Sequence, residues 1–132
     1  MQKIIKSSKK LVEEANSEIK TITITKAKDL LDNRNYLFID IRDYRELLNE
    51  GKIPGAISCP RGMLEFWIDP ESPYYKKSLD LSKFFIIYCA SAWRSALAVK
   101  TLQDMGLKNV CHIEGGFNKW KKSKAPVELL RI

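Results

Sequence analysis

The segment of the chain best suited to chemistry is the stretch Cys89-Ala90-Ser91-Ala92-Trp93-Arg94. It lies between an apolar run, residues 84–88, that predicts a buried strand, and a helical pattern that begins at about Arg94. A cysteine at the carboxyl end of a strand, followed by a short turn into a helix, lies where backbone N–H groups and the helix dipole favour negative charge. Because the thiolate is the nucleophilic form of cysteine, we expect this turn to activate Cys89.

Arg94 closes the turn and carries a permanent positive charge. We expect it either to orient an incoming oxyanion or to form a local salt bridge that braces the turn. If Cys89 accepts a sulfur atom, the terminal sulfur of the persulfide is anionic and would lie among the same N–H donors. A buried structural thiol beside an exposed, helix-capping arginine is the alternative interpretation.

The chain has three cysteines, an odd number without C-x-x-C spacing, so neither a disulfide framework nor a zinc site is expected. Cys59 and Cys111 are followed by no arginine and helix start at the spacing seen after Cys89, and we expect them to be inert core thiols. No metal or organic cofactor is implied. The single histidine, His112, is expected to be a packed or edge imidazole, since a thiolate already formed needs no separate base.

Two further pairs of residues draw attention. Asp40 and Arg42 lie at the end of a predicted strand, and we expect a structural ion pair or cap there, with Arg42 meeting Glu46 or another acid. Phe66 and Trp67 are expected to belong to a local core, although with Trp93 they would also suit the wall of a pocket mouth.

Strands and helices alternate along the chain, as the hydrophobic pattern indicates. The nearly continuous apolar runs are typical of strands covered on both faces, as in parallel sheets. We therefore predict one α/β domain with a mainly parallel central sheet flanked by helices, in which ligands bind at the carboxyl ends of the strands. The expected strands are 21–25, 36–41, a short one before Pro60, 84–88 and 109–113. Helices are expected after a Thr25 cap, at 43–50, around 63–67, at 94–105 and after Gly116. Tyr44 is expected on the buried stripe of the helix at 43–50, and Met105 on the inward face of the helix at 94–105.

The N-terminal segment is expected to form an amphipathic helix. Apolar residues recur there at seven-residue intervals: Ile4 with Leu11, and Ile5 with Val12 and Ile19. We accordingly divide the chain into an N-terminal helical extension, residues 1–20, and a domain, residues 21–132.

The composition fits a single globular domain in a reducing, cytoplasmic compartment. The chain has 132 residues, of which 45% are apolar and 30% charged. It has neither an apolar run of the ~20 residues that a membrane span needs nor the apolar core of a secretory signal. The net charge of +7 is spread over both ends, and no nucleic-acid-binding motif accompanies it.

Three ordered motifs together resemble the rhodanese-like domain family. The first is Phe38-Ile39-Asp40-Ile41-Arg42, then Glu46, then Glu50-Gly51-Lys52-Ile53-Pro54-Gly55-Ala56-Ile57. The second is Ile87-Tyr88-Cys89 through Arg94-Ser95, and the third is Glu114-Gly115-Gly116-Phe117 followed by Trp120. The resemblance implies a three-layer rhodanese-like fold. It also implies a sulfurtransferase in which Cys89 takes a sulfane sulfur from a donor such as thiosulfate and passes it to a thiol, a cyanide-like nucleophile or a sulfur-accepting protein. The remaining residues of the turn, Ala90, Ser91, Ala92, Trp93 and Arg94, become the substrate pocket.

Two positions depart from the family pattern. Ala92 stands where family members often have glycine, and a positive φ there would cost on the order of 1 kcal/mol. Lys52 stands where the family usually has histidine, and we expect it to be structural, although it or Arg61 would also add positive potential near the site.

Two other functions remain open. Cysteine phosphatases use a similar turn, but with five residues between cysteine and arginine where this chain has four. The shorter turn suits a sulfur atom on the thiol better than a bound phosphate. The other alternative is a non-catalytic module that docks a partner or carries sulfur.

Overall fold

The central element is a five-stranded sheet in the order β1-β5-β4-β2-β3, with every recorded strand pair parallel. The computed structural model describes residues 1–131, and no helix within that range is long and apolar enough to cross a membrane. The strands are β1 (Lys20–Ile22), β2 (Tyr36–Asp40), β3 (Ile57–Ser58), β4 (Phe84–Tyr88) and β5 (Val110–Ile113). The helices are α1 (Ser8–Glu18), α2 (Ile24–Asp29), α3 (Tyr44–Glu50), a 3₁₀ turn η1 (Arg61–Met63), α4 (Leu64–Ile68), α5 (Trp93–Asp104) and α6 (Gly116–Lys122).

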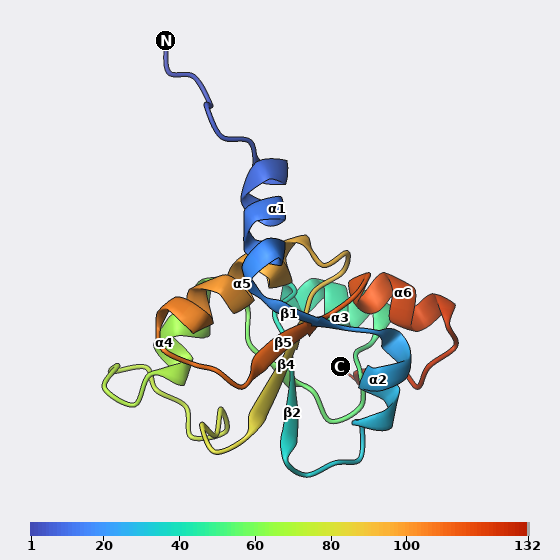
Figure 1. The fold of residues 1–132 in the computed structure, drawn as a ribbon. Coiled ribbons are helices and arrows are strands. Elements are labelled where there is room, and N and C mark those ends of the chain that lie inside the picture. Colours follow the sequence, from blue (N-terminus) through green and yellow to red (C-terminus); the bar gives the residue numbers. More distant parts are fainter. Residues whose placement is uncertain (132) are drawn as a thin grey trace.

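Helices cover the sheet on both faces, so the predicted α/β architecture is confirmed (Figure 1). Helices α2 and α6 pack on one face together with Ile86 and Tyr88 of β4. Helices α4 and α5 pack on the other face together with Ile87 and Cys89. Because successive side chains of a strand point to opposite faces, the alternation along β4 directs Cys89 toward the face covered by α5.

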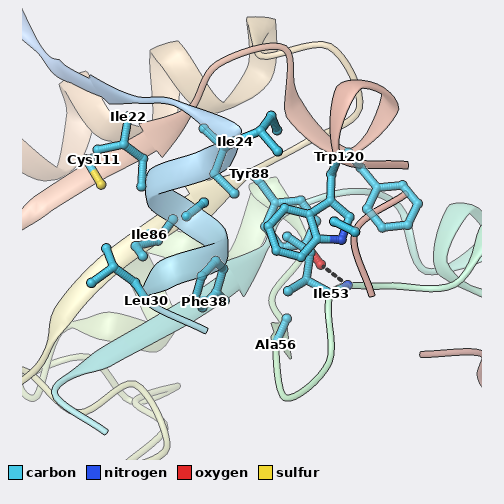
Figure 2. Packing of buried hydrophobic residues seen from close by; sticks show 14 residues of the cluster. Ile22, Ile24, Leu30, Phe38, Ile53, Ala56, Ile86, Tyr88, Cys111 and Trp120 are labelled. Atoms are coloured by element: carbon cyan, nitrogen blue, oxygen red, sulfur yellow. Dashed lines mark hydrogen bonds between the residues drawn. The ribbon is translucent and has the colours of Figure 1, made fainter. Parts of the chain in front are cut away.

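The core on the α6 side holds two loop segments, around Ile53 and around Pro126, against the sheet and α6. Trp120 of α6 is fully buried and donates its indole N–H to the carbonyl of Pro126 at 2.7 Å. The hydroxyl of Tyr88 accepts the backbone N–H of Ile53 at 3.0 Å, the contact dashed in Figure 2. The buried indole and phenol therefore both have hydrogen-bond partners. Trp120 joins α6 to the loop at Pro126, and Tyr88 joins β4 to the loop at Ile53.

Two predicted boundaries of α3 are confirmed. Asp43 and Glu46 form a capping box at its start, and Gly51, with φ of 81°, ends it. Tyr44, placed on the buried stripe by its spacing, is instead 50% exposed because it occupies the first helical position beside the cap. Met105 is likewise 44% exposed, since it caps the end of α5 beyond the last buried residue, Leu102.

The amino-terminal part differs from the sequence prediction in where its elements begin. Ser7 caps α1 by accepting the N–H of Lys10, so the helix begins later than the apolar repeat suggested and leaves Ile4 and Ile5 exposed. Helix α1 packs against α5, with Val12 and Ala15 set on Ala96. Figure 1 shows the residues before α1 extending away from the sheet.

The predicted strand 21–25 is shorter in the structure. Thr23, not Thr25, caps α2 by accepting the N–H of Lys26 at 3.1 Å. The helix therefore begins at Ile24, and β1 ends at Ile22. Both threonines can cap a helix. With Thr23 as the cap, Ile24 and Ala27 lie within α2 and are buried, and this packing favours Thr23.

Candidate active site

The sulfur of Cys89 lies directly beyond the last residue of β4, at the start of α5. It accepts the backbone N–H of Ser95 at 3.3 Å and lies 3.5 Å from the hydroxyl oxygen of Ser95. The residue is only 1% exposed. An amide in the first turn of a helix is one of the orphan donors at a helix start, so this contact favours negative charge on the sulfur.

The Cys89 loop (residues 89–94) bends sharply at Ala92. This alanine has φ of 70° and ψ of 11°, in the left-handed region, and forms the N-cap of α5. Within residues 1–131, the backbone N–H groups of residues 90–94 meet no protein acceptor. The side chains of Ser91 and Trp93 in the same segment are exposed.

Helix α6 supports the loop from behind. The amides of Phe117 and Asn118 donate to the carbonyls of Cys89 and Ala90 at 2.8 and 3.0 Å. A Cβ on Gly116 would lie 2.7 Å from both of these carbonyl oxygens, a distance that real Cβ atoms essentially never show. The absence of a side chain at Gly116 therefore allows the close approach of helix and loop.

Arg94 serves as the brace, one of the two roles expected for it. Its guanidinium donates two hydrogen bonds to the carboxylate of Glu46 on α3, at 2.7 and 3.0 Å. The bond from Arg94 holds the pKa of Glu46 below its usual range, and the same bond raises the pKa of Arg94. The pair ties α3 to the start of α5 and leaves the Arg94 charge largely compensated.

Asp40 and Arg42 form the expected structural ion pair, with Asp40 rather than Glu46 as the acid that meets Arg42. Both side chains are fully buried, and the closest nitrogen and oxygen lie 2.8 Å apart. Arg42 also donates to the carbonyl of Gly51 at 2.7 Å, and its guanidinium lies 4.1 Å from the ring centre of Phe117. The pair thus joins β2, the end of α3 and α6 behind the loop.

The family model of the rhodanese-like domain matches residues 23–123. The chain belongs to the rhodanese-like domain family.

Relatives of this rhodanese-like domain include sulfurtransferases by name. The chain is 31% identical to the Bacillus subtilis protein named "Putative sulfurtransferase YtwF", over 83% of this chain and 97% of that one. It resembles the polysulfide-sulfur transferase homodimer of Wolinella succinogenes with a TM-score of 0.69 and 30% identity, covering 92% of this chain and 87% of that one.

A solved structure from Rhodopseudomonas palustris CGA009 is also similar to this rhodanese-like domain. It has a TM-score of 0.92 and 52% identity, and the match covers 97% of this chain and 98% of that one. That protein is described as one of unknown function and a possible tyrosine phosphatase.

The other two cysteines of the rhodanese-like domain are unsuited to nucleophilic attack, as predicted. Burial raises the pKa of the Cys59 thiol to about 12 and that of the Cys111 thiol to about 11. Near neutral pH both remain protonated.

Four residues considered for roles at the site have contacts elsewhere. Lys52 donates to the carbonyl of Ala56 at 2.7 Å and lies 3.6 Å from Glu128, which makes it structural. Arg61 pairs with Glu65 at 2.7 Å. Phe66 contacts the ring of Tyr74, and Lys76 lies over the ring of Trp67.

Sequence reasoning missed two partners of the nucleophile. Ser95 contacts the sulfur, and behind it lies His112, which is 1% exposed and 2.7 Å from the Ser95 hydroxyl. The signal was present in the sequence, because a histidine in an apolar strand needs a buried hydrogen-bond partner. Which residue supplies that partner depends on the packing of α5 on β5, and the sequence pattern does not specify it.

Proposed function

We propose that the protein is a sulfurtransferase that carries sulfur as a persulfide on Cys89. In the first step the thiolate attacks the outer sulfur of a donor such as thiosulfate. A new S–S bond forms on Cys89, the donor S–S bond breaks, and sulfite leaves with the electron pair. In the second step a nucleophilic acceptor takes the terminal sulfur, and the Cys89 thiolate is restored.

One observation carries this proposal: the sulfur of Cys89 accepts the N–H of Ser95 at 3.3 Å, beside a row of amides without protein acceptors. A persulfide extends the thiol by one atom and places its negative charge at the new end. The unpaired N–H groups of the Cys89 loop supply donors for that charge. Family membership and the named sulfurtransferases among the relatives support the same assignment.

The charge at the loop bears on the choice of donor. Apart from Arg94 the loop side chains are neutral, and Arg94 is already paired with Glu46. We propose that thiosulfate, a dianion, is accepted without strong preference. Polysulfide is the donor class to compare with it, following the name of the Wolinella relative. The acceptor is a small thiol, a cyanide-like nucleophile or a protein thiol in a reducing, cytoplasmic setting.

Steady-state kinetics tests the proposal. With thiosulfate as donor and cyanide as acceptor, the protein should form thiocyanate, and varying both substrates should give the parallel lines of a ping-pong mechanism. Cys89→Ser should be inactive, whereas Cys59→Ser should retain activity as the matched control. Equal activity of Cys89→Ser and the wild type would contradict the assignment.

Two further assays on the same purified protein distinguish sulfur transfer from phosphatase activity and from a non-catalytic docking role. Hydrolysis of an aryl phosphate at a rate comparable to sulfur transfer would favour the phosphatase description attached to the Rhodopseudomonas relative. The four-residue spacing between Cys89 and Arg94 argues against that result. A folded protein inactive with every donor would favour a docking module.

A further inference from the structure

A chain of buried polar groups leads from the nucleophile to the far edge of the sheet. The Cys89 sulfur lies 3.5 Å from the Ser95 hydroxyl, which lies 2.7 Å from Nδ1 of His112. The other ring nitrogen, Nε2, lies 3.1 Å from the hydroxyl of Thr21. Ser95 and His112 are buried, whereas Thr21 is exposed on β1, the edge strand.

The imidazole of His112, in the middle of this row of hydrogen-bonded groups, is neutral. Burial lowers the pKa of His112 to about 4. A neutral imidazole has one N–H donor and one bare acceptor nitrogen, and the two can exchange places. Each ring nitrogen of His112 faces a hydroxyl, and a hydroxyl can either donate or accept. The row of hydrogen bonds from Cys89 to Thr21 can therefore run in either of two directions, and in both of them every donor has an acceptor.

We propose that Ser95, His112 and Thr21 form a proton relay that carries the Cys89 proton to solvent at the β1 edge, with His112 changing tautomer as the thiol ionises. In the starting arrangement the thiol donates to Ser95, Ser95 donates to Nδ1, and Nε2–H donates to Thr21.

The step balances without another reactant. The S–H bond breaks and its proton forms a new O–H bond on Ser95. The former hydroxyl proton of Ser95 moves to Nδ1 of His112. The proton on Nε2 moves to Thr21, whose own hydroxyl proton passes to a solvent water. In the final arrangement Nδ1–H donates to Ser95, Ser95 donates to the thiolate, and Thr21 donates to Nε2.

The relay rests on the proposed function, in which the Cys89 thiol must lose its proton before it attacks the donor. The thiol is 1% exposed, so little solvent reaches it directly. A donor molecule seated at the Cys89 loop would cover that side further. An exit at the opposite end of the chain of hydrogen bonds keeps proton release separate from substrate entry.

The charged groups on the surrounding elements do not take part. Lys20 lines the opposite side of the sheet with Cys111, away from Thr21. Four nearby charges are held in ion pairs: Arg94 with Glu46, Glu18 and Asp104 with Lys100, and Glu114 with Lys119. Lys9, Lys10 and Glu13 lie on α1, which packs against α5, and they form no hydrogen bond with Ser95, His112 or Thr21.

Nitrogen NMR reads the tautomer directly, because His112 is the only histidine in the chain. In protein labelled with ¹⁵N-histidine, the proton should lie on Nε2 while Cys89 is a thiol. It should move to Nδ1 over the pH range in which Cys89 becomes open to alkylation by iodoacetamide. Cys89→Ser should hold one tautomer across that range. A wild-type imidazole that keeps one tautomer while Cys89 ionises would overturn the relay.

A matched pair of variants at the exposed end adds a kinetic test. Thr21→Val removes the hydroxyl at constant shape, and Thr21→Ser retains it. Because Thr21 bonds Nε2 in both arrangements, we expect Thr21→Val to leave the pH of half-maximal alkylation unchanged and to lower, several-fold, the limiting rate of Cys89 alkylation at saturating iodoacetamide, where proton release sets the rate. Thr21→Ser should match the wild type. Identical limiting rates for the two variants would contradict the relay.

These outcomes are independent of sulfur transfer. If the relay is wrong but the function is right, the tautomer stays fixed while Cys89 still gains sulfur from thiosulfate. If the function is wrong but the relay is right, the tautomer follows thiol ionisation and Cys89 gains no sulfur.

Discussion

Ala92 is the residue at which the Cys89 loop carries backbone strain. A left-handed conformation costs an alanine about 1–2 kcal/mol, because its Cβ approaches the following carbonyl oxygen. The conformation is nevertheless required, since it turns the chain from the end of β4 into α5 and brings the Ser95 amide to the sulfur.

Replacing Ala92 with glycine should therefore stabilise the fold. We expect Ala92→Gly to raise the free energy of unfolding by up to about 1 kcal/mol, the strain relieved less the added chain entropy. Denaturation in urea measures the change. Ala90→Gly is the matched control, because Ala90 does not have a positive φ, and it should lower stability by about 0.5–1 kcal/mol. Equal effects of the two variants would show that Ala92 is not strained.

At the scale of elements, the loop depends on two helices that hold it from different sides. Helix α6 binds its carbonyls, and helix α3 binds Arg94 through Glu46. Both contacts join segments far apart in the sequence, so each can be tested by a substitution outside the loop itself.

Gly116→Ala should damage the contact with α6. The added Cβ would meet the carbonyl oxygens of Cys89 and Ala90 at 2.7 Å, so helix and loop must separate. We expect a loss of about 2–3 kcal/mol in the free energy of unfolding and a lower rate of sulfur transfer. Gly55→Ala is the control, because Gly55 also has a positive φ but no atom within 4 Å of its added Cβ. A Gly116→Ala protein no less stable than Gly55→Ala would contradict the close packing.

Glu46→Gln should release the guanidinium of Arg94. With the carboxylate gone, the positive charge becomes available to an anionic donor, and we expect a several-fold lower KM for thiosulfate. Glu50→Gln on the same helix, whose partner is Lys121 at 3.7 Å, should leave KM unchanged. An unchanged or raised KM in Glu46→Gln would contradict this expectation. It would mean that Arg94 supports the loop through its bond to Glu46 and does not bind the donor directly.

The same pair gives a pH dependence of stability. Arg94 lowers the pKa of Glu46 in the folded state, so the pair stabilises the fold above the unfolded carboxyl pKa of about 4.3. That contribution is lost as the pH falls through the folded value. The stability difference between wild type and Glu46→Gln should be under about 1 kcal/mol at pH 7, since the pair is partly exposed, and should close in acid. A difference that widens in acid would contradict the pairing.

At the scale of the whole molecule, the buried pair of Asp40 and Arg42 links the sheet to two helices. Asp40→Asn removes the countercharge and leaves Arg42 buried without it. We expect a loss of about 3–5 kcal/mol in the free energy of unfolding. Glu14→Gln, which breaks the half-exposed pair with Lys6, should change stability by less than about 1 kcal/mol. Similar small losses in both variants would show that the buried pair is not structural.

Most of the fold could be predicted from the sequence. The apolar runs that become β2 and β4, the capping box at Asp43 and the glycine stop at Gly51 are local signals, and the structure confirms them. The errors lie where two local signals compete. Thr23 and Thr25 are equally good caps, and only the packing of α2 on the sheet decides between them.

The candidate site was predicted in part. The position of Cys89 at the end of a parallel strand follows from local pattern, and the family resemblance singles out Ala92, whose φ is positive in the structure. The partners of the site do not. Glu46 is 48 residues from Arg94, and His112 is 17 residues from Ser95, so these pairs exist only because the sheet and helices bring them together.

The most direct test of sulfur transfer is the mass of the intact protein after incubation with thiosulfate and removal of excess donor. A variant with Cys59 and Cys111 both replaced by serine retains Cys89 as its only thiol. This variant should gain one sulfur atom and lose it again on addition of cyanide. The same protein with Cys89→Ser added should gain none. A stable gain of sulfur without Cys89, or no gain in the folded variant that retains it, would contradict the persulfide.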